Sequence, residues 1–183
     1  MWHILTSALH GRTRRSRHTL RTGVVVVIAA ACATLALGTS AGATTPITAR
    51  FPYADHFVDD GASAACGFPV TADVTGVRTI QVLFDRSGTP IQLQVHINGT
   101  GTMSANGIAL QESDHVTEFI DLVSGNETDV GLVFREVLPG LGIVIMDRGR
   151  VTIAPDGSSV LFVAGPHPAL DGDFGSLCAA LTP

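Results

Sequence analysis

The chain has 183 residues, of which 16 are acidic and 11 are arginine, and it contains no lysine. Five of the arginines lie before residue 22, whereas all the acidic residues follow residue 50, so the chain beyond residue 43 carries a net charge of about −10. Such a charge argues against binding to nucleic acid, which needs a cationic surface, and against docking on an anionic membrane.

The N-terminus has the features of a secretory signal peptide. An arginine-rich stretch without acidic residues is followed by an apolar run, Val24–Leu37, and then by small residues up to Ala43. A positive start, an apolar centre and small residues at positions −3 and −1 (Ala41 and Ala43) predict cleavage after Ala43. We therefore expect residues 1–43 to be removed and the mature protein to be secreted, or to stay in the cell envelope.

Three other interpretations of the N-terminus stay open. The apolar run could remain as an uncleaved membrane anchor, although about 14 residues is short against the roughly 20 that span a bilayer. Arg14-Arg15 could begin a twin-arginine signal, but polar residues follow the pair. The segment Ala29–Cys32 is similar to a lipoprotein box, but apolar residues continue beyond the cysteine. Cleavage by the general secretory route explains the pattern best.

The mature chain has the length of one domain. Residues 44–65 mix Thr, Ala, Pro and Asp without periodicity, which predicts an extended leader or linker before a domain over residues 66–183. Two cysteines remain after cleavage, Cys66 and Cys178, one near each end of this domain. An even number of cysteines in an exported chain predicts a disulfide between them.

From Gly67 onward, apolar and polar residues alternate, which is typical of β-strands. The clearest case is the segment 91–98, which places four aliphatic residues on one face and polar residues on the other. Residues that favour turns separate this strand from the others. The further expected strands are 70–74, 78–85, 101–104, 108–111, 117–123, 130–137, 142–147, 150–153 and 159–163.

Many short strands at near-even spacing predict an all-β fold, a single antiparallel meander that closes into a small β-barrel. A β-sandwich is the alternative, and the barrel is favoured because every connection resembles a tight hairpin. The one helical candidate is a short C-terminal turn, Ser176–Leu181, with Asp173 as its cap. Leu177 and Leu181 would share a face, so this turn is expected to plug one end of the barrel beside the disulfide.

Three late segments, 130–134, 143–146 and 160–163, are apolar on both faces. The second face needs cover, which could come from the 44–65 leader, a partner subunit or a ligand inside a hollow barrel. These strands are too short to span a membrane. We therefore expect a non-enzymatic binding module for an apolar small molecule or a protein of the cell envelope, without membrane contact after cleavage.

No catalytic or metal-binding motif stands out in the chain, and we expect neither a cofactor nor a resident metal. His167 is followed by Asp171 and Asp173, but the set lacks the further oxygen ligands of a calcium loop. Two alternatives stay open: an enzyme with a site inside the barrel, cyclase-like or isomerase-like on a lipophilic substrate, and a structural envelope protein. The polar side chains to test for a pocket are His96 on its strand, Asp114 and His115 between strands, and His167.

Two short motifs carry a resemblance to known proteins. Cys66-Gly67-Phe68-Pro69 near the start of the domain and Leu177-Cys178-Ala179-Ala180-Leu181 near its end resemble small secreted β-rich proteins of actinobacteria. The lysine-free composition, rich in Ala, Val, Thr and Gly, is in keeping with that source. The resemblance covers about residues 66–181. It implies a secreted β-rich domain and no site residue, because that group is uncharacterised.

Overall fold

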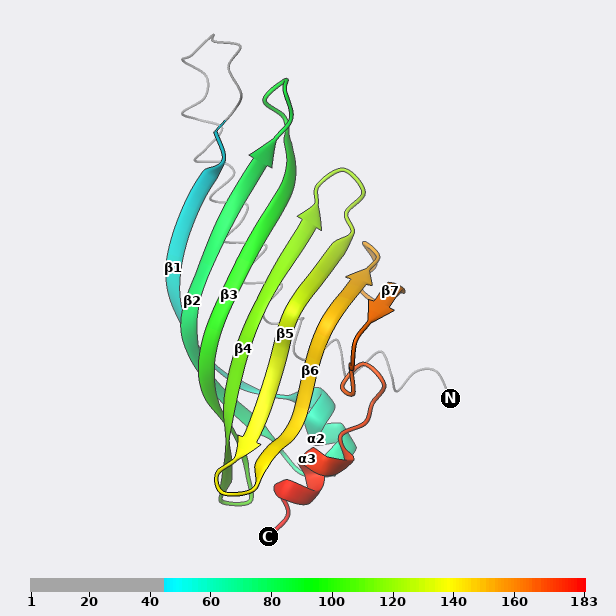
Figure 1. The fold of residues 1–183 in the computed structure, drawn as a ribbon. Helices are drawn as coiled ribbons and strands as arrows, with labels where there is room; N and C mark the ends of the chain where they lie inside the picture. Colours follow the sequence, from blue (N-terminus) through cyan, green and yellow to red (C-terminus); the bar gives the residue numbers. More distant parts are fainter. Residues whose placement is uncertain (1–44) are drawn as a thin grey trace.

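The computed structural model describes residues 45–183 as one antiparallel sheet of seven strands with two short helices (Figure 1). Each strand pairs with the next one along the chain, so the predicted all-β meander is confirmed. The elements are β1 (Ile47–Val58), α2 (Asp60–Cys66), β2 (Thr71–Phe84), β3 (Pro90–Ala105), β4 (Ile108–Asp121), β5 (Glu127–Leu138), β6 (Gly142–Ile153), β7 (Val160–Ala164) and α3 (Gly175–Ala180).

The sheet is open. β1 and β7 are its two edges, and no ladder joins them within the described residues, so the structure shows neither a closed barrel nor a two-sheet sandwich. The strands curve along their length, and both helices lie at one end of the sheet (Figure 1). We call the face on which the helices pack the inner face, and the opposite one the outer face.

The strands are fewer and longer than expected because several glycines lie inside strands instead of in turns. Gly76 of β2 lies opposite Gly99 of β3, and Gly131 of β5 lies opposite Gly149 of β6. A Cβ atom at Gly76 would overlap the backbone of β3, and one at Gly149 would overlap the backbone at the end of β7. These residues form a glycine line across the middle of the sheet, where bare backbone lets adjacent strands approach closely.

Residues 45–65 of the expected leader are part of the domain. This segment is extended over β1, as expected for a leader, but β1 is hydrogen-bonded to β2 from Ile47 opposite Val82 to Val58 opposite Thr71. Pro52 obscures the strand pattern in the sequence, and it is tolerated because an edge strand leaves alternate N–H groups unpaired. The leader is therefore not the missing cover of the late strands, since it extends the sheet sideways.

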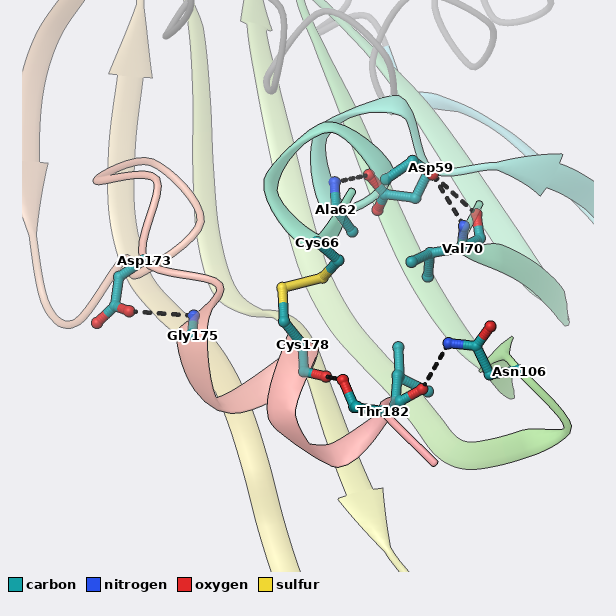
Figure 2. The surroundings of a disulfide bond; sticks show 11 residues. Asp59, Ala62, Cys66, Val70, Asn106, Asp173, Gly175, Cys178 and Thr182 are labelled. Carbon is teal, nitrogen blue, oxygen red and sulfur yellow. Dashed lines mark hydrogen bonds between the residues drawn. A yellow bond between two sulfur atoms is a disulfide. The ribbon is translucent and has the colours of Figure 1, made fainter. Parts of the chain in front are cut away.

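Helix α2 follows β1 directly, between an aspartate cap and a glycine stop. The Asp59 carboxylate accepts a hydrogen bond from the Ala62 amide at 2.9 Å, and Gly67 ends the helix in the left-handed conformation at φ 76°. Figure 2 shows α2 beside α3, joined by the predicted Cys66–Cys178 disulfide. The bridge therefore fastens the beginning of the domain to its end.

The main core lies between the two helices and the inner face. It comprises Val70, Met103, Leu110, Phe134, Ile145, Leu177 and Leu181, among others. Leu177 and Leu181 are both buried, which confirms that they share a face. Asp173 is one position before the N-terminal cap residue, Phe174, and accepts from the Gly175 amide at 3.4 Å. The C-terminal turn therefore closes the helical end of the sheet.

The late apolar segments differ in their exposure. Ile145, Val151 and Ile153 are buried on the inner face, whereas β7 and Ile143 are exposed. The exposed fractions across Val160–Val163 lie between 40% and 57%. One apolar side of these strands thus packs in the domain, and β7 is an uncharged, exposed edge.

Candidate functional site

An apolar patch lies at the end of the inner face that is farthest from the helices. It consists of Ile80, Val82, Leu93 and Val95, with Ile47, Phe84, Ile97 and Ile120 packed against them. The patch occupies consecutive inner-face rows of β1 to β4; one row runs from Ile47 through Val82 and Leu93 to Ile120. Neither helix contributes a residue to it, in contrast to the main core at the other end of the sheet.

A polar bridge crosses the sheet between the patch and the helices. The Tyr53 hydroxyl of β1 donates to the Asp114 carboxylate of β4 at 3.3 Å. The tyrosine reaches β4 over the glycine line, because Gly76 and Gly99 are the residues that lie between them in the same row. A Cβ atom at Gly99 would overlap both polar side chains. Sequence reasoning missed Tyr53, although it is the only tyrosine of the chain.

Arg78 fixes the tyrosine from one side. Its guanidinium carbon lies 4.1 Å from the centroid of the Tyr53 ring, and it pairs with the Asp55 carboxylate at 3.1 Å. Burial and the nearby charge of Asp114 raise the pKa of Tyr53 well above its ordinary value, although Arg78 acts in the opposite sense. Tyr53 is therefore a hydrogen-bond donor at neutral pH.

Acidic side chains surround this bridge on the inner face. Glu112 of β4 lies directly opposite Glu136 of β5, and both are buried. Glu118 lies opposite Asp129, three inner-face positions further from the helices along β4. Directly opposed like charges oppose strand pairing, and all four of these residues take part in further interactions. The acidic residues of this face on β4 to β6 are Glu112, Asp114, Glu118, Glu127, Asp129, Glu136 and Asp147.

Three of these carboxylates have the spacing of a cation site. Oxygen atoms of Glu118, Glu127 and Asp129 all lie within 4.8 Å of one another. Carboxylates are the ligands that calcium and magnesium prefer. Each of the three nevertheless takes part in further interactions, so we assign no metal to them.

His167 is buried in a pair with Asp147, away from the two aspartates that follow it in the sequence. Its Nδ1 lies 2.6 Å from the Asp147 carboxylate, and its Nε2 donates to the Ala164 carbonyl at 3.2 Å. Asp171 and Asp173 are exposed to solvent. The pair ties the segment after β7 to β6, and it does not form the metal cluster considered from the sequence.

The other candidate residues do not converge. His96 and His115 lie on the outer face, where the His96 ring contacts the Thr117 hydroxyl at 3.0 Å. Asp114 is inside β4, not in a loop, and faces the inner side. The alternation of the strand thus sends Asp114 and His115 to opposite faces, which removes the geometric basis for an enzyme that uses both.

Comparison with models of protein families, with curated proteins and with solved structures finds no match to this chain. Within residues 45–183, no helix is long and apolar enough to cross a membrane. The disulfide is compatible with an extracellular protein. The function is therefore inferred from the chemistry of the inner face itself.

Proposed function

We propose that the mature protein, residues 44–183, is an exported, non-enzymatic binding protein that holds an apolar small molecule against the inner face. The observation that carries this proposal is the apolar patch, whose residues belong to a cluster separate from the core beneath the helices. Small-molecule sites are concave and mainly apolar, with a few polar groups that orient the ligand. The inner face supplies both the apolar side chains and, in Tyr53 and Asp114, the polar ones.

The polar bridge supports a ligand with one polar end. Tyr53 offers a hydroxyl and Asp114 a carboxylate at the border of the patch, and one oxygen of Asp114 (Oδ1) is buried without a hydrogen-bond partner in the described part of the chain. The chemistry therefore favours a lipophile whose polar end can donate a hydrogen bond to Asp114.

Binding is favoured over catalysis for a chemical reason. A general base needs a pKa near the working pH, whereas the raised pKa of Tyr53 keeps its proton in place. The histidines on the outer face cannot reach a molecule on the inner face. The polar groups of the bridge thus suit recognition of a ligand.

A fluorescent lipophile tests the proposal. We expect N-phenyl-1-naphthylamine, a neutral dye, to brighten when titrated into the mature protein. Ile97→Gln places an amide in the patch, and burying an unpaired amide costs about 1–3 kcal/mol, so dye affinity should fall about tenfold. His96→Gln is the matched control, because it introduces the same residue one position earlier on the outer face.

The dye titration has one outcome that supports the proposal and two that contradict it. Loss of affinity in Ile97→Gln alone, with both variants keeping the unfolding midpoint of the native protein, supports the site. Equal affinity in both variants, or no dye binding by the native protein, contradicts it.

Export is a proposal of its own. The predicted signal peptide, residues 1–43, lies outside the described residues; its sequence pattern and the disulfide support secretion, and so does the resemblance to secreted actinobacterial proteins. Native mass spectrometry of the protein from culture medium would show a chain that begins at Thr44 with an oxidised cysteine pair. A full-length chain in the membrane fraction would contradict it.

A further inference from the structure

A hollow lies on the outer face, behind the acidic rows of the inner face. Its volume is about 520 Å³, which is within the range of roughly 300–1,000 Å³ found for small-molecule sites. Two neighbouring rows of the sheet form its floor. One row is Thr75, Thr100, Ser113 and Arg135, and the other is Asp73, Thr102, Gln111 and Val137.

The lining is rich in groups that recognise hydroxyls and oxyanions. Ser and Thr hydroxyls and the Gln amide both donate and accept hydrogen bonds. The Ser113 hydroxyl and the Arg135 Nε are buried and have no hydrogen-bond partner in residues 45–183. A buried donor without a partner is costly, so these two groups are ready to bind a ligand.

Arg135 supplies the positive charge of the hollow. Among the described residues it forms no salt bridge, unlike Arg78 on the inner face. Two acids also line the hollow, Asp73 and Glu112. Asp73 lies 2.6 Å from the His56 ring, and the alternation of β4 directs the Glu112 side chain to the inner face.

The charges of the late strands are sorted between the two faces. The arginines of β5 and β6 (Arg135, Arg148 and Arg150) alternate with the acidic residues Glu136 and Asp147, so they project to the outer face. Of these three arginines, only Arg135 lines the hollow.

We propose that this hollow binds an anionic sugar, with a carboxylate or phosphate on Arg135 and the sugar hydroxyls on the Thr and Ser side chains. The planar guanidinium forms paired hydrogen bonds with oxyanions of either kind. The row of Thr75, Thr100 and Ser113 continues from Arg135 across three strands, which is a suitable platform for neighbouring hydroxyl groups. This site is independent of the lipophile site on the inner face.

Chemical-shift perturbation of the labelled mature protein tests this inference. The probes are glucuronate and glucose 6-phosphate, with glucose, acetate and inorganic phosphate for comparison. We expect both sugar anions to shift the amides of Thr100, Ser113 and Arg135, and the other three probes to bind at least tenfold more weakly. Comparing glucuronate with glucose 6-phosphate identifies which anionic group the site prefers.

Three variants separate the contributions. Arg135→Gln should weaken both sugar anions at least tenfold, whereas Arg150→Gln, on the same face beside Phe162, should leave them unchanged. Thr100→Val, which keeps the shape and removes the hydroxyl, should weaken the sugar anions several-fold.

Any of three results would contradict the inference. These are the absence of shifts with either sugar anion, equal binding of glucose or inorganic phosphate, and unchanged affinity in Arg135→Gln. The dye titration of the inner face is measured on Arg135→Gln as well and should be unaffected, so failure of one site is distinguishable from failure of the other.

Discussion

Gly99 lies beneath two polar side chains that meet above its backbone. Tyr53 and Asp114 occupy the space that a Cβ atom would need, so the glycine makes the polar bridge possible. We expect Gly99→Ala to lower the unfolding free energy by about 1–3 kcal/mol, as over-packing does. Urea unfolding measures it. Gly175→Ala is the control, because its nearest neighbour would be 3.6 Å away and its stability should hardly change.

The stability loss predicted for Gly99→Ala arises at the polar bridge. If Gly99→Ala and Gly175→Ala unfolded at the same urea concentration, the close packing of Tyr53 over the glycine line would be contradicted.

Burial decides the importance of two histidine–aspartate pairs that have the same length. Each places Nδ1 2.6 Å from a carboxylate oxygen, but the side chains of His167 and Asp147 are 3% and 6% exposed, whereas those of His56 and Asp73 are 69% and 59% exposed. Breaking a buried pair costs about 3–5 kcal/mol because the remaining partner stays buried, and an exposed pair is worth about 0–1 kcal/mol.

We therefore predict a large difference between two matched variants. His167→Asn should lower the unfolding free energy by about 3–5 kcal/mol, and His56→Asn by less than about 1 kcal/mol, both measured by urea unfolding at neutral pH. Similar losses in the two variants would show that the buried pair does not hold the segment after β7.

At the scale of elements, the three hairpin turns at the end of the sheet away from the helices are stabilised in the same way. Asp85, Asp121 and Asp156 each accept hydrogen bonds from backbone amides two to four residues later in their turns. Hydrogen bonds to the ionised carboxylate lower the pKa of all three; the largest cause is the Ser87 hydroxyl for Asp85, the Ser124 amide for Asp121 and the Ser159 hydroxyl for Asp156.

The sign of the pH effect follows from these lowered values. The unfolded chain binds protons more readily than the folded one, so the stabilisation is complete above the ordinary carboxyl pKa and is lost as the pH falls towards the folded-state values. We expect urea midpoints to fall between about pH 5 and about pH 2. The change should be smaller in the triple Asp→Asn variant, and an unchanged pH dependence would contradict the assignment.

At the scale of the whole molecule, the disulfide joins elements that are 112 residues apart in the chain. Closing a loop of this length stabilises a domain by about 4–5 kcal/mol in the chain-entropy account. We expect the Cys66→Ser/Cys178→Ser variant to lose stability of that order, measured by thermal and urea unfolding. The same loss should follow reduction of the native protein, and equal midpoints for oxidised and reduced protein would contradict it.

The sequence is informative wherever local periodicity decides the structure. The alternation in 91–98 identifies a strand, and the two mature cysteines identify the bridge. A glycine in the sequence is ambiguous, because it is common both in turns and at bends inside strands. Gly76 and Gly99 lie inside strands, and the sequence alone does not distinguish the two cases. Closure of the sheet is also hidden, since it depends on pairing between β1 and β7, which no local pattern specifies.

The candidate site is harder to foresee than the fold. Tyr53 and Asp114 are 61 residues apart, and only the register of four strands brings them together. The same register separates Asp114 from its neighbour His115. The outer-face hollow likewise needs Arg135 to align with Thr75 and Thr100 across the sheet.

The unpaired edges of the sheet have a mechanical consequence. In a closed barrel, strand number and shear fix the diameter, so the interior fits ligands of one width. Here no ladder joins β1 to β7 within residues 45–183, so strand number and shear do not fix the width of the inner face. If the inner face holds an apolar molecule as proposed, lipophiles of different widths are expected to bind to it.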